Sequence, residues 1–203
     1  MFPFIRSDVM PAPFNIRREA SELEIRNAGL DHWSDIRDLH ALSFRYLTGP
    51  SVEPSQCAAF LARIREPDYT LALQAQDLLV AWIDRQPVGT AGWVPFDGRG
   101  STARITSVCV SPLFTRLGVG RRLVEAAEER ASLSGYRGLA ARVFPPSVDF
   151  FESLGYARSS QGVQSLGTQS DLPVVFMRKG GLSREKPGFA RESVAGGRAG
   201  PKR

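Results

Sequence analysis

Cysteine and histidine are scarce in this chain, with two residues of each type among 203. Two thiols, Cys57 and Cys109, make neither a disulfide framework nor a thiolate zinc site. No apolar run approaches the roughly 18 residues that span a membrane, and the first residues, MFPFIRSDVMPAPF, lack the apolar segment of a signal peptide. We therefore expect a soluble protein of a reducing, cytoplasmic compartment.

Positive charge is concentrated at the two ends of the chain. The formal net charge is +5, of which residues 180–203 carry +4 and residues 1–20 carry +1. Residues 21–179 are neutral overall, which argues against a nucleic-acid-binding face on the folded part. We expect one domain over 21–179, a flexible extension over 1–20 and a disordered, basic, Gly/Arg-rich tail over 180–203. The excess of arginine over lysine, 23 against 3, is typical of a GC-rich bacterial genome.

Apolar residues alternate with periods of two and of 3.6, which predicts a mixed α/β domain. A strand over 22–28 precedes two helices, the first capped by Asp31 and the second over 54–65. The other expected elements are strands at 78–84, 88–96 and 102–110, a helix at 121–135, a strand at 137–144, a helix at 147–155, and strands at 156–163 and 172–179. The order β-α-α-β-β-β-α-β-α-β-β predicts antiparallel strands early and a β-α-β crossover in the middle.

The segment most informative about chemistry is V-C-V-S-P-L-F-T-R-L-G-V-G-R-R-L, residues 108–123. A strand runs into a tight loop, and Gly118 and Gly120 open the next helix. Free N–H groups and the dipole at a helix start favour an anion, and glycine lets that anion approach the backbone. The alternative is a strand-to-helix turn whose glycines serve packing only. A Walker motif is absent, and the third glycine of the dinucleotide fingerprint would fall at Leu123.

The same segment resembles the signature of the Gcn5-related N-acetyltransferase (GNAT) superfamily, Q/R-x-x-G-x-G/A after a strand with an apolar triplet. The later F-F-E-S-L-G-Y, residues 150–156, is similar to the superfamily's F-Y-x-x-x-G-F motif, and L-P-V-V-F-M-R-K fits its last strand. The resemblance covers about residues 22–179. It implies a central mixed, mostly antiparallel sheet flanked by helices, and transfer of an acetyl group from acetyl-CoA directly to an amine.

The resemblance also implies site residues. The pyrophosphate of coenzyme A would be bound by the loop Arg116, Leu117, Gly118, Val119, Gly120 and Arg121. Val108, Cys109 and Val110 would line the pantetheine arm, where strand 102–110 splays from strand 137–144. The Val108 amide would donate to the thioester oxygen as negative charge develops there. The acceptor would be a small-molecule or peptide amine and the protein a monomer or homodimer; no metal is implied.

Three residues depart from the superfamily pattern. Thr115 stands where Gln or Arg is expected, Phe151 where many members carry a proton-donating tyrosine, and Arg104 where a glutamate base is frequent. No general acid or base is therefore assigned. An acyl-CoA-binding regulatory protein without significant turnover remains the alternative to an enzyme, and the basic ends leave a nucleic-acid-associated domain as a third.

The remaining polar and aromatic residues have plainer interpretations. Tyr46 and Trp93 are candidates for an acceptor pocket. Cys109 is expected to be a buried apolar thiol rather than a nucleophile. Solvated or packing positions are expected for His32 and His40, and a solvated helix face is expected for Glu125, Glu128 and Glu129.

Overall fold

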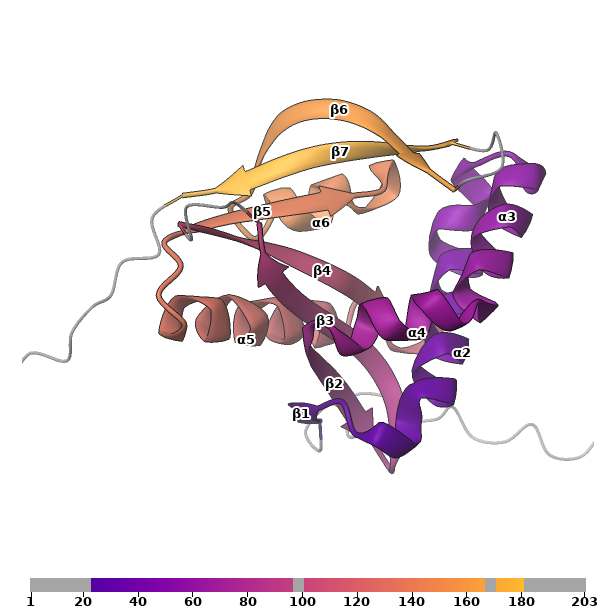
Figure 1. Ribbon diagram of the computed structural model, residues 1–203, viewed down its shortest axis with the longest axis horizontal. Coiled ribbons are helices and arrows are strands. Elements are labelled where there is room, and N and C mark those ends of the chain that lie inside the picture. Colours follow the sequence, from indigo (N-terminus) through magenta and orange to yellow (C-terminus); the bar gives the residue numbers. More distant parts are fainter. Residues whose placement is uncertain (1–22, 97–100, 167–170, 181–203) are drawn as a thin grey trace, which may run out of the picture.

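The computed structural model describes residues 23–96, 101–166 and 171–180. They form one seven-stranded sheet in the order β1-β2-β3-β4-β5-β7-β6 (Figure 1). β4 and β5 are parallel, and the other neighbours are antiparallel. The strands are β1 (Glu24–Asn27), β2 (Asp77–Ile83), β3 (Gln86–Pro95), β4 (Thr102–Val110), β5 (Gly138–Val143), β6 (Ala157–Ser165) and β7 (Asp171–Lys179). The expected mixed α/β class with a mostly antiparallel sheet is confirmed.

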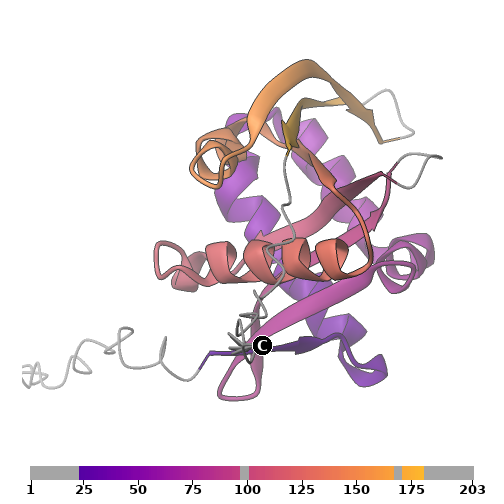
Figure 2. The same ribbon diagram turned by 90° about the vertical axis from the view of Figure 1, so that its left-hand side faces the viewer.

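Helices cover both faces of the sheet. The longest, α5 (Val119–Leu133), lies along one face, and α6 (Val148–Glu152) packs on the same side (Figures 1 and 2). Across the other face lie α2 (Trp33–Ser43) and α4 (Pro67–Gln74), while α3 (Pro54–Arg65) stands beside the C-terminal hairpin. α2 continues directly into a π-helical turn, Phe44–Thr48. Within the described ranges no helix combines the length and apolar character needed to cross a bilayer.

Strand alternation divides the core between the two faces. Ile105 of β4 is buried with Leu123 of α5 on one side. Val80 of β2 is buried with Ile36 of α2 and Leu73 of α4 on the other. Each such side chain contributes about 1.5–3 kcal/mol of burial free energy, so α5 and the α2–α4 layer are both fixed firmly against the sheet.

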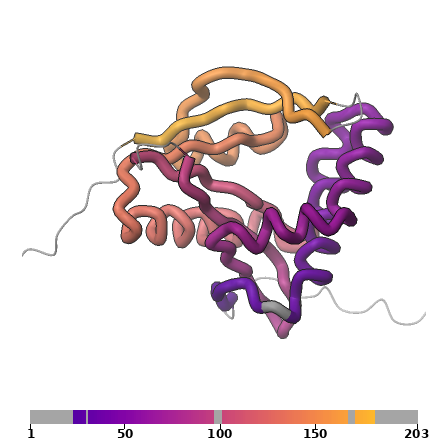
Figure 3. The backbone as a smooth tube through the Cα atoms, viewed as in Figure 1, coloured from indigo at the N-terminus to yellow at the C-terminus, as the bar shows by residue number. Residues whose placement is uncertain are grey.

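Segments far apart in the sequence meet where α3 approaches the start of β7 (Figure 3). The rings of Phe44 and Phe60 stack with centroids 4.0 Å apart and pack with Leu172 of β7. Gln56 Nε2 donates a hydrogen bond to the Asp171 carbonyl oxygen at 2.5 Å. These contacts hold the N-terminal helices beside the C-terminal hairpin.

Several local expectations need correction. The helix α4 was not expected, because it is short and buries only Leu73. Asp31 does not cap α2, because a 3-10 turn, Leu30–His32, precedes a helix that begins at Trp33. The β2–β3 turn lies at Asp84 and Arg85, both with positive φ, so β3 begins at Gln86, two residues earlier than expected.

The segments expected to be flexible fall mostly beyond the described residues. Of the ends at 1–20 and 180–203, Gly180 alone lies within them. α5 begins at Val119, two residues earlier than expected, so Gly118 becomes its N-cap residue. Glu125 and Glu129 are exposed as expected, but Glu128 is buried at 7% exposure. The expectation for Glu128 was wrong, because Lys179 of β7 supplies an ion-pair partner at 2.6 Å.

Candidate active site

β4 and β5 pair along only part of their length. Their register joins 102–105 to 138–141 and ends there, so β4 has no β5 partner from Thr106 onward. On its other edge β4 carries an irregularity, because Gly92 pairs with Thr106 but Thr90 already pairs with Cys109. Ser107 takes up the extra length with φ of 52°. A bulge of this kind bends the strand and redirects its backbone groups.

Beyond the bulge, alternate amides of β4 face away from β3. Ser111 N donates to the Val88 carbonyl of β3 at 2.8 Å. Since N–H groups alternate along a strand, those of Val110 and Val108 are directed to the opposite edge. β5 does not pair with β4 along that edge beyond Ile105. The divergence therefore opens a gap lined by backbone donors.

The loop after β4 leads this open edge into the start of α5. Arg116 and Gly118 both have positive φ, 64° and 82°, which reverses the chain within three residues. A side chain on Gly118 would meet no atom within 4 Å, so the backbone here faces open space. A Cβ on Gly120 would lie 3.3 Å from the Phe150 ring. The first turn of α5 contains no acidic residue, so the positive end of the helix dipole is not neutralised there.

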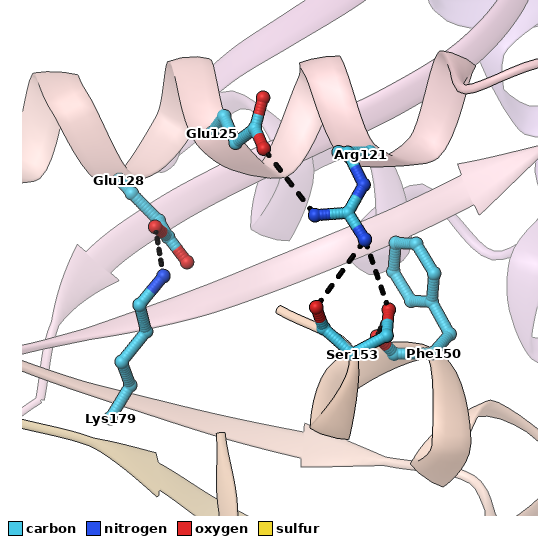
Figure 4. A network of polar contacts seen from close by, with 6 residues as sticks. All are labelled: Arg121, Glu125, Glu128, Phe150, Ser153 and Lys179. Atoms are coloured by element: carbon cyan, nitrogen blue, oxygen red, sulfur yellow. Dashed lines mark hydrogen bonds and ion pairs between the residues drawn. The ribbon is translucent and has the colours of Figure 1, made fainter. Parts of the chain in front are cut away.

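A cavity of about 810 Å³ joins the β4 edge to the start of α5. Seven of the predicted cofactor residues line it: Val108, Cys109, Val110, Arg116, Gly118, Gly120 and Arg121. Leu117 and Val119 do not, because Val119 is 1% exposed in the core and Leu117 packs against it. Arg121 donates to the backbone and hydroxyl oxygens of Ser153 at 3.3 Å and pairs with Glu125 at 3.6 Å (Figure 4).

A second cavity, of about 480 Å³, lies on the α4 side of β4. Both cavities are lined by Val108 and Cys109, and by Phe60, Tyr69, Phe144 and Ser147, so they meet at the bulge. Arg104 and Phe151, two of the departures noted above, line this second cavity. It has the size of an ordinary small-ligand site. The arrangement is thus two adjoining cavities with a row of backbone donors between them.

Comparisons with known proteins agree with this geometry. The family model described as "Acetyltransferase (GNAT) family" matches residues 33–156. The chain belongs to the GNAT acetyltransferase family. It is similar to the uncharacterized protein YyaT of Bacillus subtilis (strain 168), with 31% identity over 114 residues, which is 54% of this chain and 69% of that protein.

Solved structures share the GNAT fold at lower sequence identity. A GCN5-related N-acetyltransferase from Rhodopseudomonas palustris superposes with a TM-score of 0.68 at 22% identity, over 77% of this chain and 94% of that one. The PaiA N-acetyltransferase from Thermoplasma acidophilum, solved in complex with coenzyme A, gives 0.63 at 14% identity, over 78% and 98%.

The two candidate acceptor residues of this GNAT chain, Tyr46 and Trp93, line neither cavity. Trp93 donates its indole N–H to Asp77 Oδ2 at 2.9 Å and packs against the Tyr136 ring. Tyr46 is 60% exposed on the π-helical turn and lines neither cavity. Aromatic content alone could not distinguish these positions from Tyr69, which borders both.

A buried hydrogen-bond chain behind the bulge was missed from the sequence. His40 Nδ1 lies 2.8 Å from the Tyr69 hydroxyl, and His40 Nε2 lies 2.8 Å from Thr90 Oγ1. Thr90 Oγ1 in turn donates to the Ser107 carbonyl at 2.6 Å. Because the Thr90 hydroxyl donates its proton to the Ser107 carbonyl, its oxygen accepts a hydrogen bond from His40 Nε2–H. His40 Nδ1 then accepts one from the Tyr69 hydroxyl. The tautomer of His40 is therefore fixed by its partners.

Burial keeps the side chains of this hydrogen-bonded network uncharged. It lowers the pKa of His40 to about 4, so the imidazole is neutral at pH 7. It also raises the pKa of Tyr69 well above its ordinary value. Cys109, beside them, has a pKa raised by burial to about 12, which makes it a thiol rather than a nucleophilic thiolate. His40 lies on the buried face of α2, and Tyr69 belongs to α4, a helix that was not expected from the sequence.

Proposed function

We propose that the protein is an acetyl-CoA-dependent N-acetyltransferase that moves an acetyl group directly to an amine. One observation carries this proposal: the open edge of β4 and the glycine-rich start of α5 border a single cavity that meets a second cavity at the bulge. A donor and an acceptor molecule can therefore approach each other from the two sides of Val108 and Cys109.

The residues around the first cavity fit the parts of acetyl-CoA. The amides at the start of α5, with Arg116 and Arg121 at the rim, suit its pyrophosphate. The backbone from Val108 to Val110 suits the amide-bearing pantetheine arm, which can add to the open strand edge. Leu117 and Val119 would serve as backbone donors, with their side chains turned to the core. When bound, acetyl-CoA supplies a thioester carbon that an amine can attack.

The Val108 N–H is directed into the gap where a thioester oxygen would lie. Its position beyond the bulge is fixed by the pairing of Cys109 with Thr90. A donor that is already oriented stabilises negative charge on that oxygen without reorganisation, which is worth about 2.7–4 kcal/mol for one oxyanion-hole donor. Val108 would therefore contribute through its backbone and not through its side chain.

Tyr69 is the group best placed to move the proton. It lines both cavities, so it would border both the amine and the leaving sulfur in the proposed complex. Its own proton points to His40 Nδ1 at 2.8 Å. Tyr69 can thus take the amine proton on its oxygen while its own proton turns from His40 to the leaving sulfur, so His40 stays neutral. The net change is one proton from nitrogen to sulfur, without Phe151 or Arg104 as acid or base.

The regulatory alternative rests on Phe151 and Arg104, which replace the expected acid and base, and Tyr69 weakens that reason. The two functions differ in turnover and share cofactor binding. Incubation with acetyl-CoA and a panel of amines, read as release of free thiol, separates them. We expect turnover with at least one amine class; tight acetyl-CoA binding with background turnover across the panel would favour the regulator.

Cofactor binding is tested at Gly120. Gly120→Val introduces a branched side chain where even a Cβ would lie 3.4 Å from Val110 and 3.3 Å from Phe150, so it should fill the cavity at the helix start. We expect calorimetry to show at least about a hundredfold weaker coenzyme A binding, while the melting temperature changes little. Ala126→Val, on the same helix and outside the cavity, is the matched control and should bind normally. Unchanged affinity in Gly120→Val would refute the assignment of the site.

A further inference from the structure

The second cavity carries positive charge that nothing described in the structure balances. Arg63 of α3, Arg104 of β4 and Arg142 of β5 line it, and none of the described lining residues is acidic. Within the described part of the chain none of the three forms an ion pair. Three arginine residues from three separate elements therefore border one space of about 480 Å³.

Two of these arginines share one face of the sheet. Arg104 pairs with Ala140, and Arg142 follows Ala140 by two residues, so both side chains project on the face opposite α5. Neighbouring like charges on adjacent strands are destabilising. The pKa of Arg142 is lowered by burial first and by the charge of Arg104 second. The fold thus tolerates an electrostatic cost at this position.

Ion pairs with carboxylates balance some of the cations elsewhere in the described chain. Four of its basic side chains reach a carboxylate within 4 Å: Arg121 to Glu125, Arg130 to Asp77, Arg158 to Glu152 and Lys179 to Glu128. Among the described residues the three cavity arginines have no such carboxylate, and the Arg104 guanidinium lies 5.4 Å from the centroid of the Phe96 ring. A guanidinium fork matches carboxylate and phosphate geometry in two parallel hydrogen bonds, so such an anion is the natural counter-charge.

We propose that the amine acceptor is a small molecule that also carries a carboxylate or phosphate group, which the cavity arginines bind. This inference rests on the proposed acetyltransferase function and names the class of its acceptor. The anionic end lies among Arg63, Arg104 and Arg142, and the amine end lies toward Val108 and Tyr69, where the two cavities meet. Gln76, held by Thr106 Oγ1 at 2.6 Å and Ser107 Oγ at 2.8 Å, lines the same space.

The same charges exclude another acceptor class. Polyamines and aminoglycosides are polycations at neutral pH, and each would bring ammonium groups into a cavity with three guanidinium groups. Like charges in a partly desolvated space repel strongly. The cavity therefore selects against these acceptors as well as for anionic amines.

Matched amine pairs test the inference by turnover. The pairs are methionine with methioninamide and phosphoethanolamine with ethanolamine, and spermidine represents the polycations. We expect kcat/KM at least tenfold higher for an anionic member than for its neutral partner, and no turnover of spermidine. The amino-acid pair and the phosphate pair show which anion is preferred. Equal or better use of the neutral members or of spermidine would overturn the proposal.

Substitutions of the cavity arginines test whether the preference for anionic amines arises in this cavity. Arg104→Gln and Arg142→Gln should each raise KM for the preferred anionic amine about tenfold or more and leave KM for acetyl-CoA unchanged. Arg65→Gln, exposed on the same helix as Arg63, and Arg178→Gln, exposed on β7, are matched controls outside both cavities and should change neither value. A loss shared by variants and controls would mean a general charge effect and would refute the site.

A binding measurement keeps the inference testable if no amine in the panel turns over. Glutarate and 1,5-diaminopentane at equal ionic strength provide a dianion and a dication of similar length. Glutarate should raise the melting temperature of the wild type and not that of Arg104→Gln/Arg142→Gln. The diamine should raise neither. Loss of coenzyme A binding in calorimetry would count against the proposed function, whereas normal coenzyme A binding without stabilisation by glutarate would refute this inference alone.

Discussion

Lys179 at the end of β7 and Glu128 in the middle of α5 form an ion pair with Nζ and Oε2 2.6 Å apart (Figure 4). The Glu128 side chain is 9% exposed and that of Lys179 is 26% exposed, so the pair is largely removed from water. Lys179 also lies over the Tyr156 ring, 5.5 Å from its centroid. The Tyr156 pKa is raised by burial and by the nearby Glu128 charge. The pair therefore joins the last strand to the central helix through a polar contact inside the core.

Replacing Lys179 alone should destabilise the protein more than replacing both Lys179 and Glu128. Lys179→Met leaves the buried Glu128 carboxylate without its counter-charge, and we expect a loss of about 3–5 kcal/mol in the free energy of unfolding. In Glu128→Leu/Lys179→Met both charges are gone, and most of that stability should return. Urea unfolding of the two variants measures the difference. A double variant as unstable as Lys179→Met would show that packing of the lysine stem, and not charge, is what matters.

Glu128 also shows where sequence reasoning about this fold is limited. The apolar face of α5 was readable from Leu123, Val124, Ala127 and Ala131, because four apolar positions repeat at helical spacing. The burial of Glu128 was not, because its partner comes from a strand that lies 51 residues later. Local patterns predict which face of a helix is apolar. They do not predict which charged side chain from a distant part of the sequence will pair with a residue at the edge of that face.

The same distinction applies to the candidate site. The Gly118-x-Gly120 loop is a contiguous motif, and the sequence placed it at the correct strand-to-helix junction. The Tyr69–His40–Thr90 chain joins three elements across the bulge, and a contiguous motif cannot reveal such a contact. α4, which carries Tyr69, buries a single residue along its eight positions and so lacks a clear helical pattern.

The neutral state of His40 predicts how stability depends on pH. Its pKa is about 4 in the folded protein, against about 6.5 in an unfolded chain. Between these values the unfolded state binds a proton that the folded state does not, so the free energy of unfolding falls as the pH falls from about 6.5 toward about 4. This group alone contributes a slope of up to about 1.4 kcal/mol per pH unit in that window.

His40→Gln removes the titrating ring and should flatten that part of the profile. Urea unfolding between pH about 4 and 7 measures the wild type and the variant under the same conditions. Carboxylates titrate in the same range in both proteins, so the difference between the two slopes reports His40. Parallel profiles would show that His40 is protonated in the folded protein.

The proposed proton route predicts a kinetic effect at Tyr69. Tyr69→Phe removes the hydroxyl that donates to His40, and we expect kcat to fall by about a hundredfold, the lower end of what acid–base catalysis contributes. KM for acetyl-CoA should change little, because in the proposed binding mode the α5 start and the Val108–Val110 backbone, and not the Tyr69 hydroxyl, hold the cofactor. Tyr46→Phe, at an exposed tyrosine that lines neither cavity, is the matched control and should retain full activity. A drop of less than threefold in Tyr69→Phe would exclude the route.

Phe151 decides whether this chain has replaced or simply lost the proton donor that many relatives have at that position. The Phe151 ring is 3% exposed, packs edge-on against Phe150 and Tyr156, and belongs to a residue that borders the 480 Å³ cavity. We expect stability to change by no more than about 1 kcal/mol, the lower end of the cost of a misplaced hydroxyl. If Tyr69 already moves the proton, kcat should change less than threefold in the wild-type background, whereas the same substitution should recover at least tenfold in the Tyr69→Phe background. Steady-state thiol release from the four proteins measures both effects. A large gain in the wild-type background would instead mean that the native chain lacks a proton donor, and it would favour the regulatory acyl-CoA-binding protein over the enzyme.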